Sequence, residues 1–165
     1  MSNTKGIIHI RVDDRLIHGQ VAGLWTNELN ATRLMVINDG ISADEAQKSL
    51  LRMVAPGTVN TSIISEEKAF NNISQDKYQG QRVFVIVKSP VELLRLIEQG
   101  LEIKEINVGN MSNRKDTTTI KQGISVTEEE RQAFIDLLDK GVKITTIRIP
   151  TDKEVLLTQS DLEQA

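Results

Sequence analysis

The sequence predicts an α/β fold: a doubly wound, mostly parallel open sheet with helices on both faces, formed by a single domain over residues 1–165. Apolar runs rich in Ile and Val recur along the chain and alternate with segments of helical pattern, as in a sheet buried on both faces. No repeat, low-complexity tract or long Pro/Gly/Ser linker divides the chain. A length of 165 residues suits one hydrophobic core, which must be aliphatic because only 3% of the residues are aromatic.

The expected strands are residues 6–12, 33–37, 59–64, 82–87, 103–108 and 143–149. A helix follows the first strand at 20–29, where apolar residues at helical spacing place Trp25 in the core. Three further helices have start signals at 42–45, 89–92 and 127–130, and two of them have glycine stop signals at Gly100 and Gly141.

Composition excludes several classes of function. The 20 Lys and Arg against 23 Asp and Glu give a net charge of -3, so we expect no nucleic-acid partner. The chain has no Cys, which excludes disulfides and thiolate sites. The first residues lack the apolar core of a signal peptide, and no apolar run approaches the roughly 20 residues that cross a bilayer. We therefore expect a cytoplasmic protein whose membrane association comes through a partner.

Ligands of a doubly wound sheet bind outside the C-terminal ends of the strands, so the informative loops are 13–19, 38–42, 65–68, 88–90 and 109–122. The first of these loops brings together Asp13, Asp14, Arg15 and His18. His18 precedes a helix N-terminus, where free amides and the helix dipole stabilise an anion, and Arg15 could clamp a phosphate. Either aspartate could orient the imidazole and leave its other nitrogen as a nucleophile. The same residues also fit a loop ion pair with a capping histidine.

The segment 11–21, Arg-Val-Asp-Asp-Arg-Leu-Ile-His-Gly-Gln-Val, closely resembles the active-site segment of the IIB proteins of the mannose/fructose/sorbose family of the bacterial phosphoenolpyruvate-dependent sugar phosphotransferase system (PTS). Three further matches follow in the expected order: Trp25, the Val-Ala-Pro at 54–56 and the Ile-Asn-Val-Gly-Asn-Met at 106–111. The resemblance covers about residues 6–150, and the segment 151–165 is less specific.

The resemblance implies a phosphoryl relay. In that family a IIA phosphohistidine passes its phosphoryl group to the loop histidine of IIB, which passes it to a sugar bound by the membrane subunits IIC and IID. His18 matches the acceptor, with the phosphoryl group expected on Nδ1. Arg15 matches the family arginine, and Asp14 matches the acidic residue beside it; we assign them phosphate clamping and ring orientation. Such a transfer needs no metal and no cofactor.

Other residues are weaker candidates for holding the phosphoryl group or a partner. They are Asp13, Gly19, Gln20, Asn110 and Ser112 near the expected strand ends, and the cations Arg33 and Lys48, which could dock an acidic IIA surface. The 109–112 segment also fits a simple turn with a buried Met111. His9, inside the first strand, is expected to have a structural role.

Other classes of enzyme do not fit. The chain has no Gly-x-Gly-x-x-Gly turn and no Gly-Lys-Ser/Thr phosphate loop, and it lacks an Asp acceptor after the third strand that a receiver domain would need. The acidic residues and His18 have no recognised metal-ligand spacing. The alternative is a IIB-like docking or regulatory module that passes no phosphate. The sequence leaves open the sugar and the oligomeric state.

Overall fold

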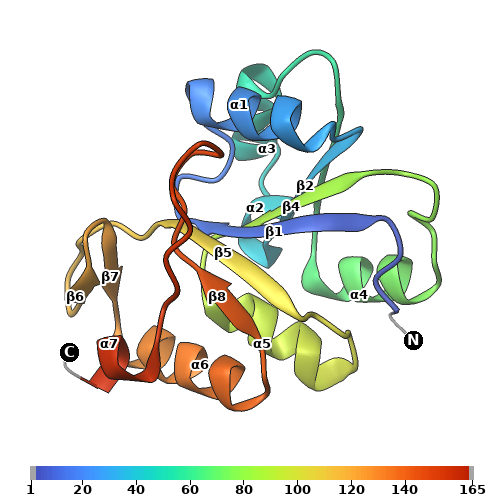
Figure 1. Cartoon of the computed structure of the whole chain (residues 1–165). Helices are drawn as coiled ribbons and strands as arrows, with labels where there is room; N and C mark the ends of the chain where they lie inside the picture. Colours follow the sequence, from blue (N-terminus) through green and yellow to red (C-terminus); the bar gives the residue numbers. More distant parts are fainter. Residues whose placement is uncertain (1–2, 164–165) are drawn as a thin grey trace.

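The sheet that positions the site has six parallel strands in the order β3-β2-β4-β1-β5-β8 (Figure 1). The structure, a computed structural model, describes residues 3–163 except for the side chain of Gln20. The strands are β1 (Ile7–Asp13), β2 (Arg33–Ile37), β3 (Asn60–Ile64), β4 (Val83–Val87), β5 (Glu105–Asn110) and β8 (Lys143–Thr145). The predicted doubly wound, parallel sheet is therefore confirmed.

Helices cover both faces of this sheet. In Figure 1, α1 (Gly19–Leu29) and α3 (Glu45–Val54) lie above the sheet, and α4 (Glu66–Ser74), α5 (Pro90–Gln99) and α6 (Glu128–Asp139) lie below it. Strand β4 shows how the strands serve two cores, because Phe84 and Ile86 join the cluster under α1, whereas Val83, Val85 and Val87 join the cluster on the other face. Trp25 packs in the α1 cluster with 5% exposure, as expected.

Two of the three predicted helix starts are confirmed. The side chains of Thr127 and Glu130 form the capping box of α6, and the Ser89 side chain caps α5 with Pro90 in its first turn. The third start was wrong by two residues, because Asp44 rather than Ser42 caps α3. Ser42 instead ends a short helix, α2 (Asp39–Ser42).

Three segments differ from the expected elements. Residues 65–68, expected as a loop, begin α4, whose cap is the Ser65 side chain. The loop expected at 109–122 contains β6 (Thr118–Lys121), which forms an antiparallel hairpin with β7 (Ile124–Val126). The strand predicted at 143–149 ends at Thr145, and the chain then crosses toward α1 before it reaches α7 (Gln159–Glu163) (Figure 1). Among the described residues, no helix has the length and apolar character to span a membrane.

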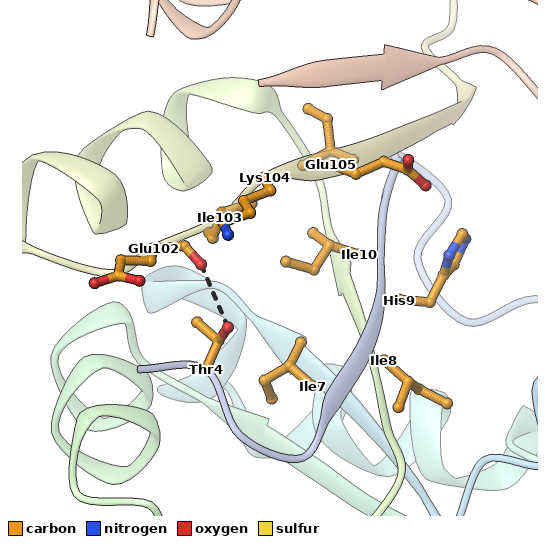
Figure 2. A pocket seen from close by; sticks show the side chains of 10 residues that line it. Thr4, Ile7, Ile8, His9, Ile10, Glu102, Ile103, Lys104 and Glu105 are labelled. Carbon is orange, nitrogen blue, oxygen red and sulfur yellow. Dashed lines mark hydrogen bonds between the residues drawn. The ribbon is translucent and has the colours of Figure 1, made fainter. Parts of the chain in front are cut away.

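Strands β1 and β5 are paired only near their C-terminal ends, from Arg11 to Asp13 on β1. Toward their N-terminal ends the two strands separate around a groove of about 200 Å³ (Figure 2). The Thr4 hydroxyl donates to the Glu102 carbonyl across one end of this groove, at 3.3 Å. The strands therefore meet tightly only where the polar loops follow them.

The strand order reverses between β1 and β4. After β1 the chain crosses above the sheet through α1 to β2, and after β4 it crosses below the sheet through α5 to β5 (Figure 1). Val12 is paired with Val87, so Asp13 and Lys88 leave neighbouring strands at the same edge. This reversal is where ligands of doubly wound sheets bind.

Candidate functional site

The loop 14–18 joins β1 to α1 and is anchored by its apolar residues. Leu16 and Ile17 are buried in the α1 cluster, and Leu16 adopts a left-handed backbone with φ 59°. Because these two side chains turn inward, Arg15 and His18 stay at the surface, with side chains 41% and 29% exposed. The buried apolar residues thus fix the loop backbone, and the loop exposes the Arg15 guanidinium and the His18 imidazole.

Asp13, at the end of β1, is the buried centre of the site. Its Oδ1 accepts hydrogen bonds from the Arg15 backbone and Nε, both at 3.0 Å, and its Oδ2 accepts from the second Arg15 nitrogen at 3.1 Å. Arg11 also donates to Oδ2, from Nε at 3.4 Å and from its terminal nitrogen at 3.3 Å. One carboxylate therefore organises two guanidinium groups.

His18 occupies the position just before α1, and its Nε2 lies 3.8 Å from Oδ2 of Asp13. That distance is too long for a hydrogen bond, and the buried Nε2 has no hydrogen-bond partner within the described residues. Burial lowers the pKa of His18, Arg15 lowers it further, and Asp13 partly opposes both. The imidazole is therefore neutral at neutral pH, with the Nε2 edge toward Asp13.

The aspartate beside the ring is Asp13, whereas the sequence interpretation gave that place to Asp14. Asp14 instead accepts three hydrogen bonds from the end of β5 and the residues that follow it: from the Asn110 amide at 2.9 Å, and from the backbone and hydroxyl of Ser112 at 2.7 and 3.2 Å. Met111 between them is 1% exposed. Asn110 and Ser112 thus contact the loop that follows β1 through Asp14, and the turn with a buried Met111 is also present.

Gly19 and Gln20 begin α1. The backbone of Gly19 has φ +43°, a conformation that favours glycine, and no atom lies within 4 Å of the position that a Cβ would take. Its backbone conformation therefore accounts for glycine at this position. The side chain of Gln20 lies outside the described residues. His18 makes no side-chain cap to α1, so it does not occupy the first amides of the helix.

Arg33 and Lys48 are not part of this cluster. Arg33 starts β2, at the opposite edge of the sheet, where it donates to Gln81 at 2.8 Å and to Ser62 at 2.7 Å. Lys48 lies on α3, 3.5 Å from Glu45. Arg33 therefore lies away from His18, because the N-terminal end of a parallel strand faces away from the loops that follow the strands. Its role in docking a partner stays a prediction.

A polar pocket of about 450 Å³ opens at the strand-order reversal, beside Arg15. Its lining comes from four loops and helix starts: Asp14, Arg15, Lys88, Ser89, Glu92, Ser112, Arg114 and Glu130. Burial raises the pKa of Glu92 to about 8, with repulsion from Glu66 adding to the effect. Glu92 is therefore uncharged at neutral pH, and the exposed Lys88 ammonium contributes to the charge of this pocket.

Sequence reasoning missed two residues of this region, Arg11 and Lys88. A charged residue at position 11, among the Ile and Val of a strand, is itself an unusual signal because a buried charge requires partners. Lys88 lay in a loop that we considered informative, but nothing in its sequence context distinguished it from a surface lysine. The described residues contain no group of three or more His, Asp or Glu arranged to hold a metal ion.

Comparison with known proteins identifies the family. The family profile described as "PTS system sorbose subfamily IIB component" matches residues 7–164. The chain belongs to this family. The chain is 37% identical over 145 residues to the mannose-specific EIIAB component of Escherichia coli (strain K12), covering 88% of its own length. The chain spans only 45% of the length of that relative.

Other relatives are similar over most of their length. The fructose-specific EIIB component of Bacillus subtilis (strain 168) is 37% identical over 146 residues, which cover 88% of this chain and 90% of the relative. The crystal structure of the IIB domain of the sorbose permease from Klebsiella pneumoniae superposes with a TM-score of 0.89 at 32% identity, covering 96% of each chain. The expected resemblance to the mannose/fructose/sorbose family is therefore confirmed.

Proposed function

We propose that residues 1–165 form one PTS IIB domain that accepts a phosphoryl group on Nδ1 of His18 from a IIA phosphohistidine and passes it to a sugar. The observation that carries this proposal is the setting of His18. Its neutral imidazole turns Nε2 toward Asp13 at 3.8 Å, at the start of α1 and beside the half-exposed Arg15. This arrangement leaves Nδ1 as the nucleophile.

The transfer balances without a co-reactant. The lone pair of Nδ1 forms the new P–N bond while the P–N bond of the donor breaks and its electrons return to the donor nitrogen. The proton stays on Nε2, where the Asp13 carboxylate stabilises the positive charge that the ring gains. Arg15 and the first amides of α1 balance the charge of the phosphoryl oxygens.

The donor is proposed to dock over α3 and not on Arg33. Leu50, Met53 and Val54 on this helix are 62%, 79% and 49% exposed, and we call them the α3 surface. Leu50 and Arg15 line the same hollow, so the α3 surface continues into the site. Exposed apolar side chains beside a reactive group are typical of a partner surface. Lys48 on the same helix remains a candidate contact for an acidic donor.

The membrane subunits IIC and IID and their bound sugar are the proposed acceptors, which places the chain at the cytoplasmic side of the transporter. Relatives are named as specific for mannose, fructose, sorbose or N-acetylgalactosamine. We accordingly propose a hexose or an amino sugar as the substrate. The activity would be that of a protein-phosphohistidine–sugar phosphotransferase, with no cofactor.

Phosphorylation of the purified chain from phosphoenolpyruvate, through enzyme I, the histidine carrier and a cognate IIA, tests the proposal. We expect wild type to acquire an acid-labile, alkali-stable label and His18→Ala to acquire none. His9→Phe is the matched control, because it removes the other of the two histidines and should be labelled normally. If neither wild type nor His18→Ala is labelled while IIA is phosphorylated, a docking module is the better interpretation.

A further inference from the structure

Arg11 is a charged side chain on β1 that is 2% exposed, yet every one of its N–H groups has an acceptor. A guanidinium carries five N–H donors. In addition to the two bonds to Asp13, Arg11 donates to the Asn107 side chain at 2.8 Å and to the backbone carbonyls of Ile147 and Arg148, both at 3.0 Å. A buried charge is tolerated when it is fully hydrogen-bonded in this way.

The close neighbours of Arg11 restrict the position of its guanidinium. Its guanidinium lies 5.2 Å from the centre of the Trp25 ring, and Trp25 Nε1 donates to the Arg148 carbonyl at 3.0 Å. On the side of β5, a Cβ at Gly109 would collide with the guanidinium. Arg11 is thus held between an aromatic ring, a glycine and the backbone of residues 147–148.

Asp13 receives its orientation from this anchored group. Arg11 contacts only Oδ2 of Asp13, whereas Arg15 contacts both oxygens. Oδ2 is also the oxygen that faces Nε2 of His18. If Arg11 were absent, the carboxylate would be held by Arg15 alone, whose side chain is 41% exposed, and Oδ2 would be less firmly fixed relative to His18.

We propose that Arg11 is a positioning residue for phosphoryl transfer, which fixes the Asp13 carboxylate between Arg15 and His18 by anchoring it to the backbone of residues 147–148. This inference rests on the proposed function. Arg11 is fully buried and does not contact the phosphoryl group itself. Its effect is geometric, and small displacements of reacting groups cost large factors in rate.

Arg11→Lys tests the inference because it keeps the positive charge and removes the planar fork. We expect kcat for phosphorylation by IIA to fall about tenfold or more, with KM for the donor nearly unchanged. We also expect the pKa of His18, followed by NMR, to rise as the released Asp13 approaches Nε2. Arg82→Lys is the matched control: Arg82 precedes β4 at the opposite edge and also donates to backbone carbonyls, those of Leu29 and Asn30.

A purely structural Arg11 would give a different result. Arg11→Lys would then melt at a lower temperature, but the folded protein would keep the wild-type kcat and His18 pKa, and the inference would be overturned. Should Arg11→Lys not fold, Trp25→Phe decides, since it removes the Nε1 donor at the Arg148 carbonyl together with part of the ring that faces Arg11. We expect a fall in kcat of about threefold at constant KM, and a wild-type kcat would reject the inference. Failure of wild type to accept phosphate would instead overturn the proposed function.

Discussion

The two histidines of the chain differ in what surrounds them, although they belong to one strand and the loop that follows it. His9 is stacked on Trp25 with ring centres 4.6 Å apart and is tilted against Phe84 at 5.4 Å. Burial lowers its pKa to about 4, and the charge of Arg11 adds to this. His18 is also neutral, but its ring is partly exposed beside charged groups. Both imidazoles are therefore neutral. What distinguishes His18 as the candidate nucleophile is that its ring is accessible to a partner and lies beside charged side chains in fixed positions.

The largest expected effect is on the pH dependence of the free energy of unfolding, to which His9 should contribute much more than His18. His9 binds a proton more weakly when folded, so the unfolded chain binds more protons between pH 6.5 and 4 and stability falls as the pH drops. The shift corresponds to about 3 kcal/mol at pH 4. His9→Phe, which keeps an aromatic ring against Trp25, should lack this loss in urea unfolding at pH 7 and pH 4.

His18→Ala is the control for that measurement. Its imidazole is partly exposed, at 29%, so solvent screens its charge and the variant should retain most of the acid-induced loss seen in wild type. An equal pH dependence in wild type and His9→Phe would show that the stacked ring does not stay neutral.

The next effect concerns the charges around His18. Arg15→Ala should slow phosphoryl transfer by about 10- to 100-fold, since one charge-assisted hydrogen bond contributes about 1.5–3 kcal/mol. Arg33→Ala, at the opposite edge of the sheet, should leave the rate unchanged. Rapid-quench measurement of label transfer from IIA would check both, and a wild-type rate in Arg15→Ala would remove Arg15 from the site.

The smallest effect concerns access of the donor to His18. Replacing Leu50 and Met53 of the α3 surface by Ser should raise KM for phosphorylated IIA about fivefold and leave kcat unchanged. Val155→Ser is the control, because Val155 is 46% exposed but lies on the segment beside β8. Equal KM values for the double variant and wild type would mean that the donor docks elsewhere.

Strand positions could be predicted where they depend on local patterns. The strand at 33–37 has the predicted limits, and the others of the first five differ by at most two residues at either end. The end of β8 could not be predicted in this way. Residues 146–149 continue the apolar pattern of a strand, but the carbonyls of Ile147 and Arg148 bind Arg11, and the Arg148 carbonyl also accepts from Trp25. Contacts with residues more than 100 positions away in the sequence therefore end the strand.

The site was predictable as a cluster, but its internal pairing was not. Asp13 and Asp14 are adjacent in sequence, and strand geometry sends neighbouring side chains in opposite directions. Which of them meets His18 depends on Arg11 inside β1 and on the C-terminal end of β5, where Asn110 and the nearby Ser112 hold Asp14. Sequence spacing carries no information about either contact.

The burial of Leu16 and Ile17 affects how often the loop that carries His18 can change its conformation. Because both side chains belong to the α1 cluster, and because β1 is paired on both sides, the loop 14–18 can leave its position only if part of that core opens. Openings of this kind are rare compared with the brief encounters between two proteins in solution. The loop is therefore already ordered when a donor arrives, because its conformational entropy was lost on folding. The free energy of donor binding does not have to offset that loss.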